Sequence, residues 1–403
     1  MGRKVFLLMA GFAMAVSCGL QEIGDGSSTG DDIWKGPGSV ISGGSSGAGV
    51  GKKVWYAVGV DYPKGYDWMA DEKNGSVMCS LVVFANGIPM MKVPVGDEYE
   101  TSADPDMCRM IGDCLYTDYS TETETVVKRN GKELLRYPGR EMIIDMAVQG
   151  EYLYTLGQNR NGSGFSFRRN GEVLIERSSG YVFPRLQLGE DGYSFSFCEV
   201  IGEYERYFHY LAGEVCQVAV RDDIKKIWDV IYVEDKLCYL ASMVGISAPV
   251  LANGQDMMPL AMPAGSEVVS CRFVTDSREL NIEGVISQKG KALFSGLWKG
   301  NKLIKMFSPG YVVTCFCANG DDVSCILNPP ENLSAGIIYH AGESFTIPDG
   351  YKSMGGRSMT MLDGLLYVGL TSTEISDERA SMWVDEEMKP LKINGFISNI
   401  SIN

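Results

Sequence analysis

A short turn signal recurs along the whole chain. Apolar runs joined by Asn-Gly or a close variant occur eight times, as in "FRRNGEVLIER" (residues 167–177). Asn-Gly between such runs predicts a two-residue hairpin turn, because glycine and asparagine tolerate the positive φ angles that this turn requires. Successive turns are 40 to 46 residues apart, and they fall at Gly87, Gly131, Gly171, Gly213, Gly254, Gly300, Gly342 and, in degenerate form, Asp385-Glu386. This period is typical of the blades of a β-propeller.

The rest of each period contains two more strand-like segments. In the third unit "EMIIDMAV" is followed by a short turn and then by "YLYTLGQ". A four-stranded unit of this size cannot bury both of its faces alone, whereas radial stacking of such units does so and leaves few open edges. The amphipathic helices that an α/β fold would need are missing from the pattern. We therefore predict an all-β fold: a β-propeller of eight four-stranded blades, with seven blades as the alternative.

The two ends of the repeat region complement each other. The first unit begins with "KKVWYAVGV", which is typical of a second strand whose innermost strand is missing. The chain ends with "NGFISNISIN", a single strand-like segment with four apolar side chains. The C-terminal segment is therefore expected to complete the first blade and to close the ring.

The N-terminus is typical of an exported protein. Arg3 and Lys4 precede the apolar run "VFLLMAGFAMAV", which is too short to span a bilayer and is followed by Ser17 and Cys18. The stretch "AVSCG" resembles the lipobox of bacterial lipoproteins, with alanine where leucine is usual. The resemblance implies that residues 1–17 are a signal peptide and that Cys18 carries a lipid. The alternative is a plain secreted protein in which Cys18 has no such role.

The composition after Cys18 predicts a tether and then a folded domain. Residues 18–52 are rich in Gly, Ser and Asp, which favours a flexible coil, and the propeller is expected over residues 53–403. With 51 acidic and 36 basic side chains the formal net charge is −15, which disfavours nucleic acid as a partner. The expected partner of Cys18 is a lipid bilayer. The predicted location is the cell envelope of a Gram-negative-type bacterium, lipid-anchored at the outer membrane or cell surface.

The repeat itself resembles one group of propellers. The WD40 dipeptides, the kelch double glycines and the sialidase Asp-box do not recur at blade spacing. Segments such as "YTLGQ" with "FRRNGEV", and "FSGLWKGNKLIKM", resemble the repeats of bacterial lipoproteins whose β-propellers have no assigned activity. These motifs are structural, so the resemblance implies a fold and surface anchoring only.

Histidine and cysteine do not predict a catalytic or metal site. The two histidines, His209 and His340, are expected in different blades and at different distances from their turns. Of the ten cysteines after Cys18, most lie in strand-like runs, where a free thiol acts as a small core side chain. The disulfides considered are Cys108–Cys114 and Cys317–Cys325. We predict no catalytic residue, no metal ligand and no cofactor.

Charged residues are expected to face the central channel. Asp145 and Asp229 occupy similar places in two predicted innermost strands, "IIDMAV" and "IWDVIY". Arginines are expected near the same level in other blades: Arg109, Arg185, Arg272 and Arg357. Such a channel would either bind a polar ligand or contain internally paired charges. A carboxylate pair across a cleft would suit glycoside hydrolysis.

One long loop in the first unit is the best candidate for binding. "DYPKGYDWMADEKNGSVM" (residues 61–78) carries Tyr62, Tyr66 and Trp68 among glycine, proline and charged residues. Aromatic side chains on a loop of a rigid scaffold suit stacking on sugars or contact with a protein. The alternative is that Trp68 packs on the ring. "NPPENLSAG" (328–336) and "TSTEISDER" (371–379) are lesser loops of the same kind.

Three functions are compatible with the sequence. The main hypothesis is a non-catalytic module that binds a glycan or a protein partner. The second is an exported hydrolase or lyase that acts on glycans with carboxylates at the channel mouth. The third is a rigid spacer in an envelope assembly.

Overall fold

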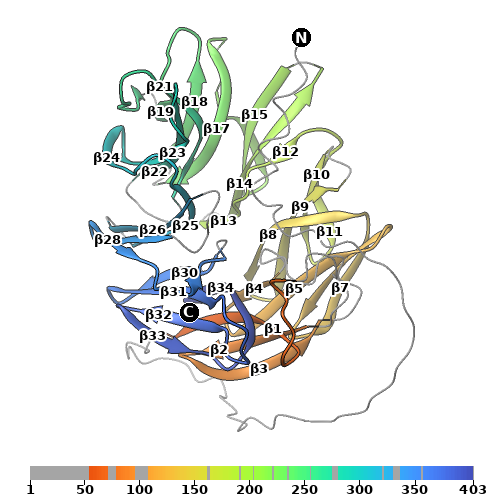
Figure 1. Ribbon diagram of the computed structural model, residues 1–403. Helices are drawn as coiled ribbons and strands as arrows, with labels where there is room; N and C mark the ends of the chain where they lie inside the picture. The colour runs from red at the N-terminus through yellow and green to blue at the C-terminus, as the bar shows by residue number, and fades with distance from the viewer. Residues whose placement is uncertain are drawn as a thin grey trace, which may run out of the picture.

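Eight antiparallel sheets surround a central axis in the computed structural model (Figure 1). The structure describes residues 54–70, 79–95, 108–160, 164–189, 192–202, 204–219, 222–233, 236–254, 256–274, 280–319, 322–329, 336–354 and 357–402. The predicted signal peptide, Cys18 and the tether lie outside these ranges. Within them the regular structure is entirely β, and no helix long and apolar enough to cross a membrane is found there.

The sheets are numbered here as blades 1 to 8. Blade 1 contains β34 (Asn394–Ile402), β1 (Trp55–Tyr62), β2 (Ser80–Ala85) and β3 (Ile88–Pro94), and blade 2 contains β4 (Cys108–Ile111), β5 (Cys114–Ser120), β6 (Glu124–Arg129) and β7 (Lys132–Pro138). Blade 3 contains β8 (Glu141–Gln149), β9 (Tyr152–Asn159), β10 (Phe165–Arg169) and β11 (Glu172–Arg177), and blade 4 contains β12 (Tyr181–Val182), β13 (Gln187–Gly189), β14 (Gly192–Ile201), β15 (Tyr204–Leu211) and β16 (Glu214–Gln217). Blade 5 contains β17 (Ile224–Val233), β18 (Lys236–Met243), β19 (Val250–Asn253) and β20 (Asp256–Pro259), and blade 6 contains β21 (Ser266–Phe273), β22 (Asn281–Gln288), β23 (Phe294–Lys299) and β24 (Lys302–Met306). Blade 7 contains β25 (Val312–Asn319), β26 (Asp322–Asn328), β27 (Ile337–His340) and β28 (Glu343–Thr346), and blade 8 contains β29 (Tyr351–Lys352), β30 (Met359–Leu362), β31 (Leu365–Ser372), β32 (Ala380–Val384) and β33 (Glu387–Pro390).

The C-terminal strand closes the ring, as the sequence predicts. β34 pairs antiparallel with β1 over eight residue pairs from Trp55–Ile402 to Tyr62–Asn394, so blade 1 takes its innermost strand from the other end of the chain. On its other face β34 contacts β31 of blade 8. The described residues therefore form an eight-bladed β-propeller, and the seven-bladed alternative is excluded.

The recurring turn joins the third and fourth strands of each blade. Asn86, Asn130 and Asn170 each have φ near 50°, and the glycine that follows each of them also has positive φ. Each asparagine also accepts a hydrogen bond through Oδ1 from the backbone N–H of Trp55, Leu115 or Leu153, at the start of the second strand of the same blade. Asparagine at this place therefore stabilises the turn and ties the outer hairpin to the middle of the blade.

The innermost strands of several blades contain an extra residue. Pairing shifts by one at Ile144 in β8, Trp228 in β17, Val269 in β21 and Thr314 in β25. Such a bulge bends the strand and re-aims the side chain that follows it. In blades 4 and 8 the innermost strand is broken instead, into β12 and β13 and into β29 and β30.

The apolar core lies between neighbouring blades. Phe165 and Phe167 of blade 3 contact Phe195 and Phe197 of blade 4, with ring centroids 4.9 to 6.4 Å apart. All four rings are at most 2% exposed. Because each blade covers its neighbour in this way, the backbone at the axis is held in place and can position polar side chains.

Candidate functional site

The carboxylate of Asp145 links three consecutive blades at the axis. It follows the bulge of β8 in blade 3 and accepts a hydrogen bond from Arg109 Nη1 of blade 2 at 2.6 Å. Its other oxygen accepts from the backbone N–H of Leu186 in blade 4 at 2.8 Å, and Oδ1 also accepts from the N–H of Met146. A carboxylate with three donors from three blades acts as a clamp between them.

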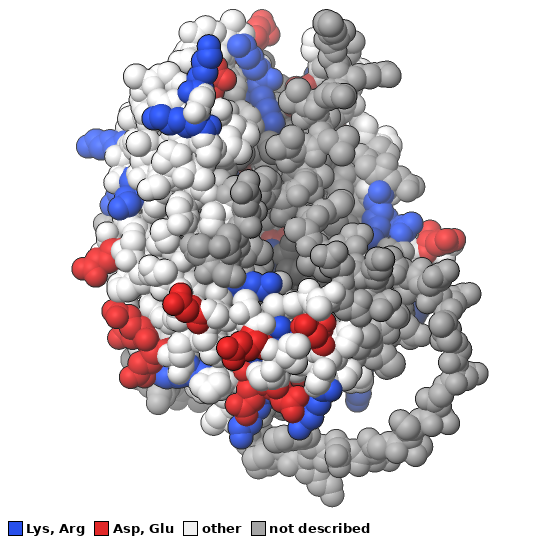
Figure 2. Space-filling model, in the orientation of Figure 1, with Lys and Arg blue, Asp and Glu red and all other residues white. Residues whose placement is uncertain are grey.

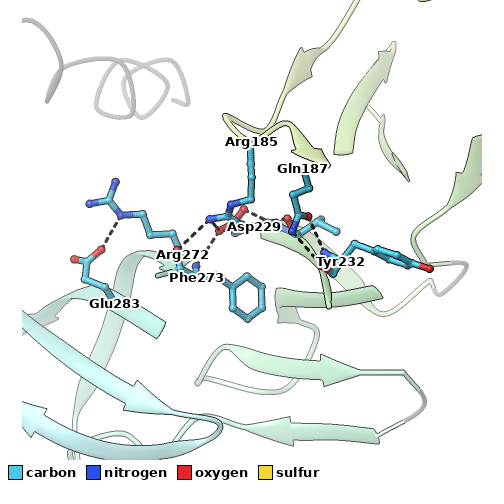
Figure 3. Close-up of polar contacts among 8 residues, drawn as sticks. Arg185, Gln187, Asp229, Tyr232, Arg272, Phe273 and Glu283 are labelled. Carbon is cyan, nitrogen blue, oxygen red and sulfur yellow. Dashed lines mark hydrogen bonds and ion pairs between the residues drawn. The ribbon is translucent and has the colours of Figure 1, made fainter. Parts of the chain in front are cut away.

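Asp229 repeats this arrangement two blades further on (Figure 3). It follows the bulge of β17 in blade 5, where Arg185 of blade 4 lies 3.4 Å from Oδ2 and the N–H of Phe273 in blade 6 donates to the same oxygen at 2.9 Å. Oδ1 accepts from the N–H of Val230. The sequence suggested either a polar ligand site or internally paired charges, and both aspartates are paired across blades.

Two buried glutamates are also held by arginines. Glu141 accepts from Arg168 Nη2 at 2.9 Å and from the Ser166 hydroxyl. Glu283 accepts from Arg272 Nε at 2.9 Å, and burial raises the pKa of Glu283 while the charge of Arg272 opposes the rise. None of these four acids therefore forms the kind of unpaired carboxylate couple that glycoside hydrolysis uses.

Tyr62 at the end of β1 and Tyr66 and Trp68 of the loop that follows lie together at one end of blade 1, where Tyr62 and Trp68 pack against the apolar core that blades 1 and 2 share. The rings of Tyr62 and Trp68 are stacked, with centroids 5.5 Å apart and planes at 14°, and the Tyr66 ring lies 5.8 Å from that of Tyr62. Trp68 also packs on Phe396 of β34 at 5.2 Å. All three loop side chains are half-buried. We call this set the seam cluster.

Two buried polar side chains hold the loop against the ring. Arg379, which is 1% exposed, donates to Asp67 at 2.7 Å, and its guanidinium carbon lies 5.5 Å from the centroid of the Trp68 ring. Asn394 donates through Nδ2 to the carbonyls of Pro63 and Tyr66, at 2.8 and 2.9 Å. The seam cluster is therefore preorganised, which lowers the entropy that a ligand must overcome on binding.

A lysine adds a second positive charge beside this loop. Lys352 of β29 is half-buried, and its pKa is lowered chiefly by burial and next by the charge of Arg379, against the attraction of Asp67. Lys352 and Arg379 were missed at the level of sequence. Their sequence signal is weak, because Lys352 lies in the short strand β29, Arg379 lies just before β32, and Arg379 is 312 residues from Asp67.

Each histidine is hydrogen-bonded to a serine of its own blade. His209 Nδ1 lies 2.9 Å from the Ser196 hydroxyl, and burial lowers the pKa of this imidazole to about 4. His340 Nδ1 lies 2.7 Å from the Ser324 hydroxyl in another blade. Within the described ranges no group of His, Cys, Asp and Glu side chains could hold a metal ion.

The disulfide candidates are not formed. None of the ten cysteines after Cys18 is in a disulfide, Cys108, Cys114, Cys317 and Cys325 included, and eight of the ten are buried. Cys108 and Cys114 lie on paired strands but face other residues, since Cys108 is opposite Thr117 and Cys114 is opposite Ile111. The prediction of mostly buried thiols is confirmed, and the two proposed bridges were wrong.

Comparison with known proteins shows structural similarity at low sequence identity. No protein-family model matches the chain, and no curated protein matches it. It is similar to the β-propeller domain of the Trilobed protease from Pyrococcus furiosus (10% identity, 68% of this chain and 87% of that one, TM-score 0.43). It is also similar to a dihydro-heme d1 dehydrogenase (12%, 86% and 74%, 0.47) and to TolB from Acinetobacter baumannii (11%, 84% and 82%, 0.37). At these values the similarities carry no argument about activity.

Proposed function

We propose that this chain is an exported lipoprotein whose propeller binds a glycan without catalysis, at the seam cluster. The observation that carries this proposal is the half-buried aromatic group in which Tyr62 stacks on Trp68 and Tyr66 is tilted against Tyr62, on a loop held in place by Arg379 and Asn394. Flat apolar faces of pyranose rings stack on such aromatic groups, and a rigid platform favours this binding.

The charge of the surrounding surface favours an uncharged ligand. The face drawn in Figure 2 carries most of its acidic side chains over its lower half, where Figure 1 places blades 8 and 1. The loop from β31 to β32, which contacts the aromatic loop, adds exposed Glu374, Asp377 and Glu378. A polyanionic ligand would be repelled there, whereas a neutral oligosaccharide would not.

Removal of one seam aromatic tests the binding site. We expect the full-length protein to bind one or more uncharged hexose oligosaccharides in isothermal titration, and Tyr66→Ala to weaken that binding about tenfold, since loss of one aromatic contact costs about 1–2 kcal/mol. The fold should survive, because it is the backbone carbonyl of Tyr66 that accepts from Asn394.

Tyr204 provides the matched control for this experiment. It is 76% exposed, and it follows the second strand of blade 4, so it lies at the same end of the ring as the aromatic loop. Tyr204→Ala should leave binding unchanged. Equal losses in both variants, or no binding of any oligosaccharide by the unmodified protein, would refute the glycan proposal. The latter result with an intact ring would favour the spacer hypothesis.

The proposed anchor is tested separately at Cys18. The apolar run before Cys18 and the Gly/Ser-rich segment after it support a lipid-modified cysteine on a tether. We expect Cys18→Ala to move the protein from the membrane fraction to the soluble fraction of an expressing Gram-negative cell, because a single site would carry the lipid. Cys216→Ala, which removes an exposed thiol of the ring, is the control. Unchanged membrane partition of Cys18→Ala would contradict the lipoprotein assignment.

A further inference from the structure

Arginine and aspartate alternate around part of the axis. Arg109 is in blade 2, Asp145 in blade 3, Arg185 in blade 4 and Asp229 in blade 5, and each arginine is bonded to the aspartate of the next blade. Blade 6 continues the pattern with Arg272, which lies two residues after the position of β21 that matches Asp229 of β17. The next member of the series would be a carboxylate in blade 7.

Blade 7 has a cysteine at that position. Cys315 follows the bulge of β25 as Asp145 and Asp229 follow theirs. Its thiol makes the same two backbone contacts, one with the next residue, Phe316, and one with Ser358 of the following blade. Burial raises the pKa of this thiol to about 12, although the nearby charge of Arg272 opposes the rise. Cys315 is therefore uncharged and gives Arg272 no counter-ion.

Arg272 is oriented by two other groups. Its Nε donates to the buried carboxylate of Glu283 at 2.9 Å, and its guanidinium carbon lies 4.5 Å from the centroid of the Phe316 ring in blade 7. The side chain is 49% exposed, whereas that of Arg109 is 5% exposed. In Figure 3 the two terminal nitrogens of Arg272 point away from Asp229. Among the described residues these nitrogens have no hydrogen-bond acceptor or ion-pair partner.

We propose that Arg272 is the centre of an anion-binding site at the axis, where its two terminal nitrogens bind the oxygens of a carboxylate or phosphate group. A guanidinium presents two parallel N–H groups that match such oxyanions, and stacking on Phe316 and the Glu283 bond fix the plane of this fork in advance. Arg185 donates to the carbonyl of Phe273, the residue next to Arg272, but its charge is paired with Asp229, so Arg272 is the cation that would face the ligand.

This site is separate from the seam cluster. Arg272 lies near the end of the first strand of its blade, whereas the aromatic loop follows the second strand of blade 1. In a blade of antiparallel strands these two connections lie at opposite ends. A ligand at Arg272 therefore enters from the other mouth of the ring, and the two sites can be tested independently.

The experiment follows the Nε–H signals of arginine in the full-length, ¹⁵N-arginine-labelled protein. Inorganic phosphate and glucuronate are titrated separately at constant ionic strength, with sodium chloride as the reference. We expect one arginine signal to shift saturably with at least one of the two anions, with a Kd of about 1 mM, and to be absent from Arg272→Ala. The anion that gives the tighter response identifies the preferred oxyanion.

Three variants distinguish specific anion recognition from a general effect of charge. Cys315→Asp supplies the missing carboxylate, so it should pair with Arg272 and weaken anion binding about tenfold while the arginine remains. Arg136→Ala, which removes an exposed arginine already paired with Glu124 and Glu133, should change nothing. Tyr66→Ala should also leave the response intact.

The proposal is overturned by either of two results. One is an anion response that persists at full strength in Arg272→Ala, which would place the binding elsewhere. The other is a set of arginine signals that phosphate and glucuronate move no more than sodium chloride does. Should Cys315→Asp fail to fold, as judged by its thermal unfolding, Arg272→Gln replaces it, because glutamine keeps an N–H donor but loses the fork and the charge.

Discussion

Asp229→Ala is expected to lower the free energy of unfolding by about 3–5 kcal/mol. The carboxylate accepts from Arg185 of blade 4, from the N–H of Phe273 in blade 6 and from the N–H of Val230 in its own strand. Its removal leaves a guanidinium that is only 13% exposed without its ion-pair partner, and a buried N–H without its acceptor. The loss should appear as a lower midpoint in urea denaturation followed by circular dichroism.

Two control variants separate the clamp from ordinary charge effects. Asp229→Asn keeps one carbonyl oxygen as acceptor and loses the charge, so its loss should be smaller than that of the alanine variant. Glu133→Ala breaks an ion pair with Arg136 in which both side chains are more than one third exposed, and it should change the free energy of unfolding much less than Asp229→Ala does, because water screens the charges of an exposed pair. If Asp229→Ala were no more destabilising than Glu133→Ala, the inter-blade clamp would have no energetic role.

Removal of β34 is expected to abolish cooperative folding of the ring. A chain that ends at Ile393 loses Phe396, Ile397 and Ile400, each at most 6% exposed, and leaves the long edge of β1 unpaired. Burial of three such side chains contributes about 5–9 kcal/mol, which is comparable to the whole stability of a typical domain. Limited proteolysis and calorimetry should show rapid cleavage and no single sharp transition.

Moving β34 to the N-terminal side of β1 tests whether the strand must lie at the C-terminus of the chain to close the ring. Ile402 lies opposite Trp55 in the sheet, so residues 394–402 placed before residue 54 and joined by a short hairpin turn should pair with β1 as before. This rearranged chain should recover a sharp transition. A truncated chain as stable as the unmodified protein would show that blade 1 does not need its innermost strand.

The fold was predictable because its strongest signals are local. The Asn-Gly turns fix two backbone dihedrals each, and their spacing gives the blade count without any knowledge of distant contacts. The closing strand was predictable because the first unit of the repeat lacks an innermost strand and the chain ends with one strand-like segment that belongs to no unit of its own. The broken strands of blades 4 and 8 were not predicted, although Pro184, which cannot donate to a sheet ladder, marks the break between β12 and β13.

The site was predictable only in part, because its contacts join residues far apart in the chain. The sequence indicated that Asp145 and Asp229 match each other, but the pairing of each with an arginine from the preceding blade depends on the rotation between blades. Arg379 and Asn394 meet the aromatic loop more than 300 residues away. The candidate disulfides were wrong for a different reason, which is the register of the paired strands: Cys108 is opposite Thr117, and Cys317 is opposite Ser324.

The alternation of arginine and aspartate also makes two blades, not one, the repeating unit of charge around this part of the axis. From blade 2 to blade 6 the charge at the axis repeats every two blades, so a duplication or deletion of a single blade in this arc would set two arginines or two carboxylates against each other. A duplication or deletion of two blades would keep an arginine next to an aspartate at every position. A propeller with this device is therefore expected to tolerate the gain or loss of two blades better than that of one, and the series ends at blade 7, where Cys315 stands in place of a carboxylate.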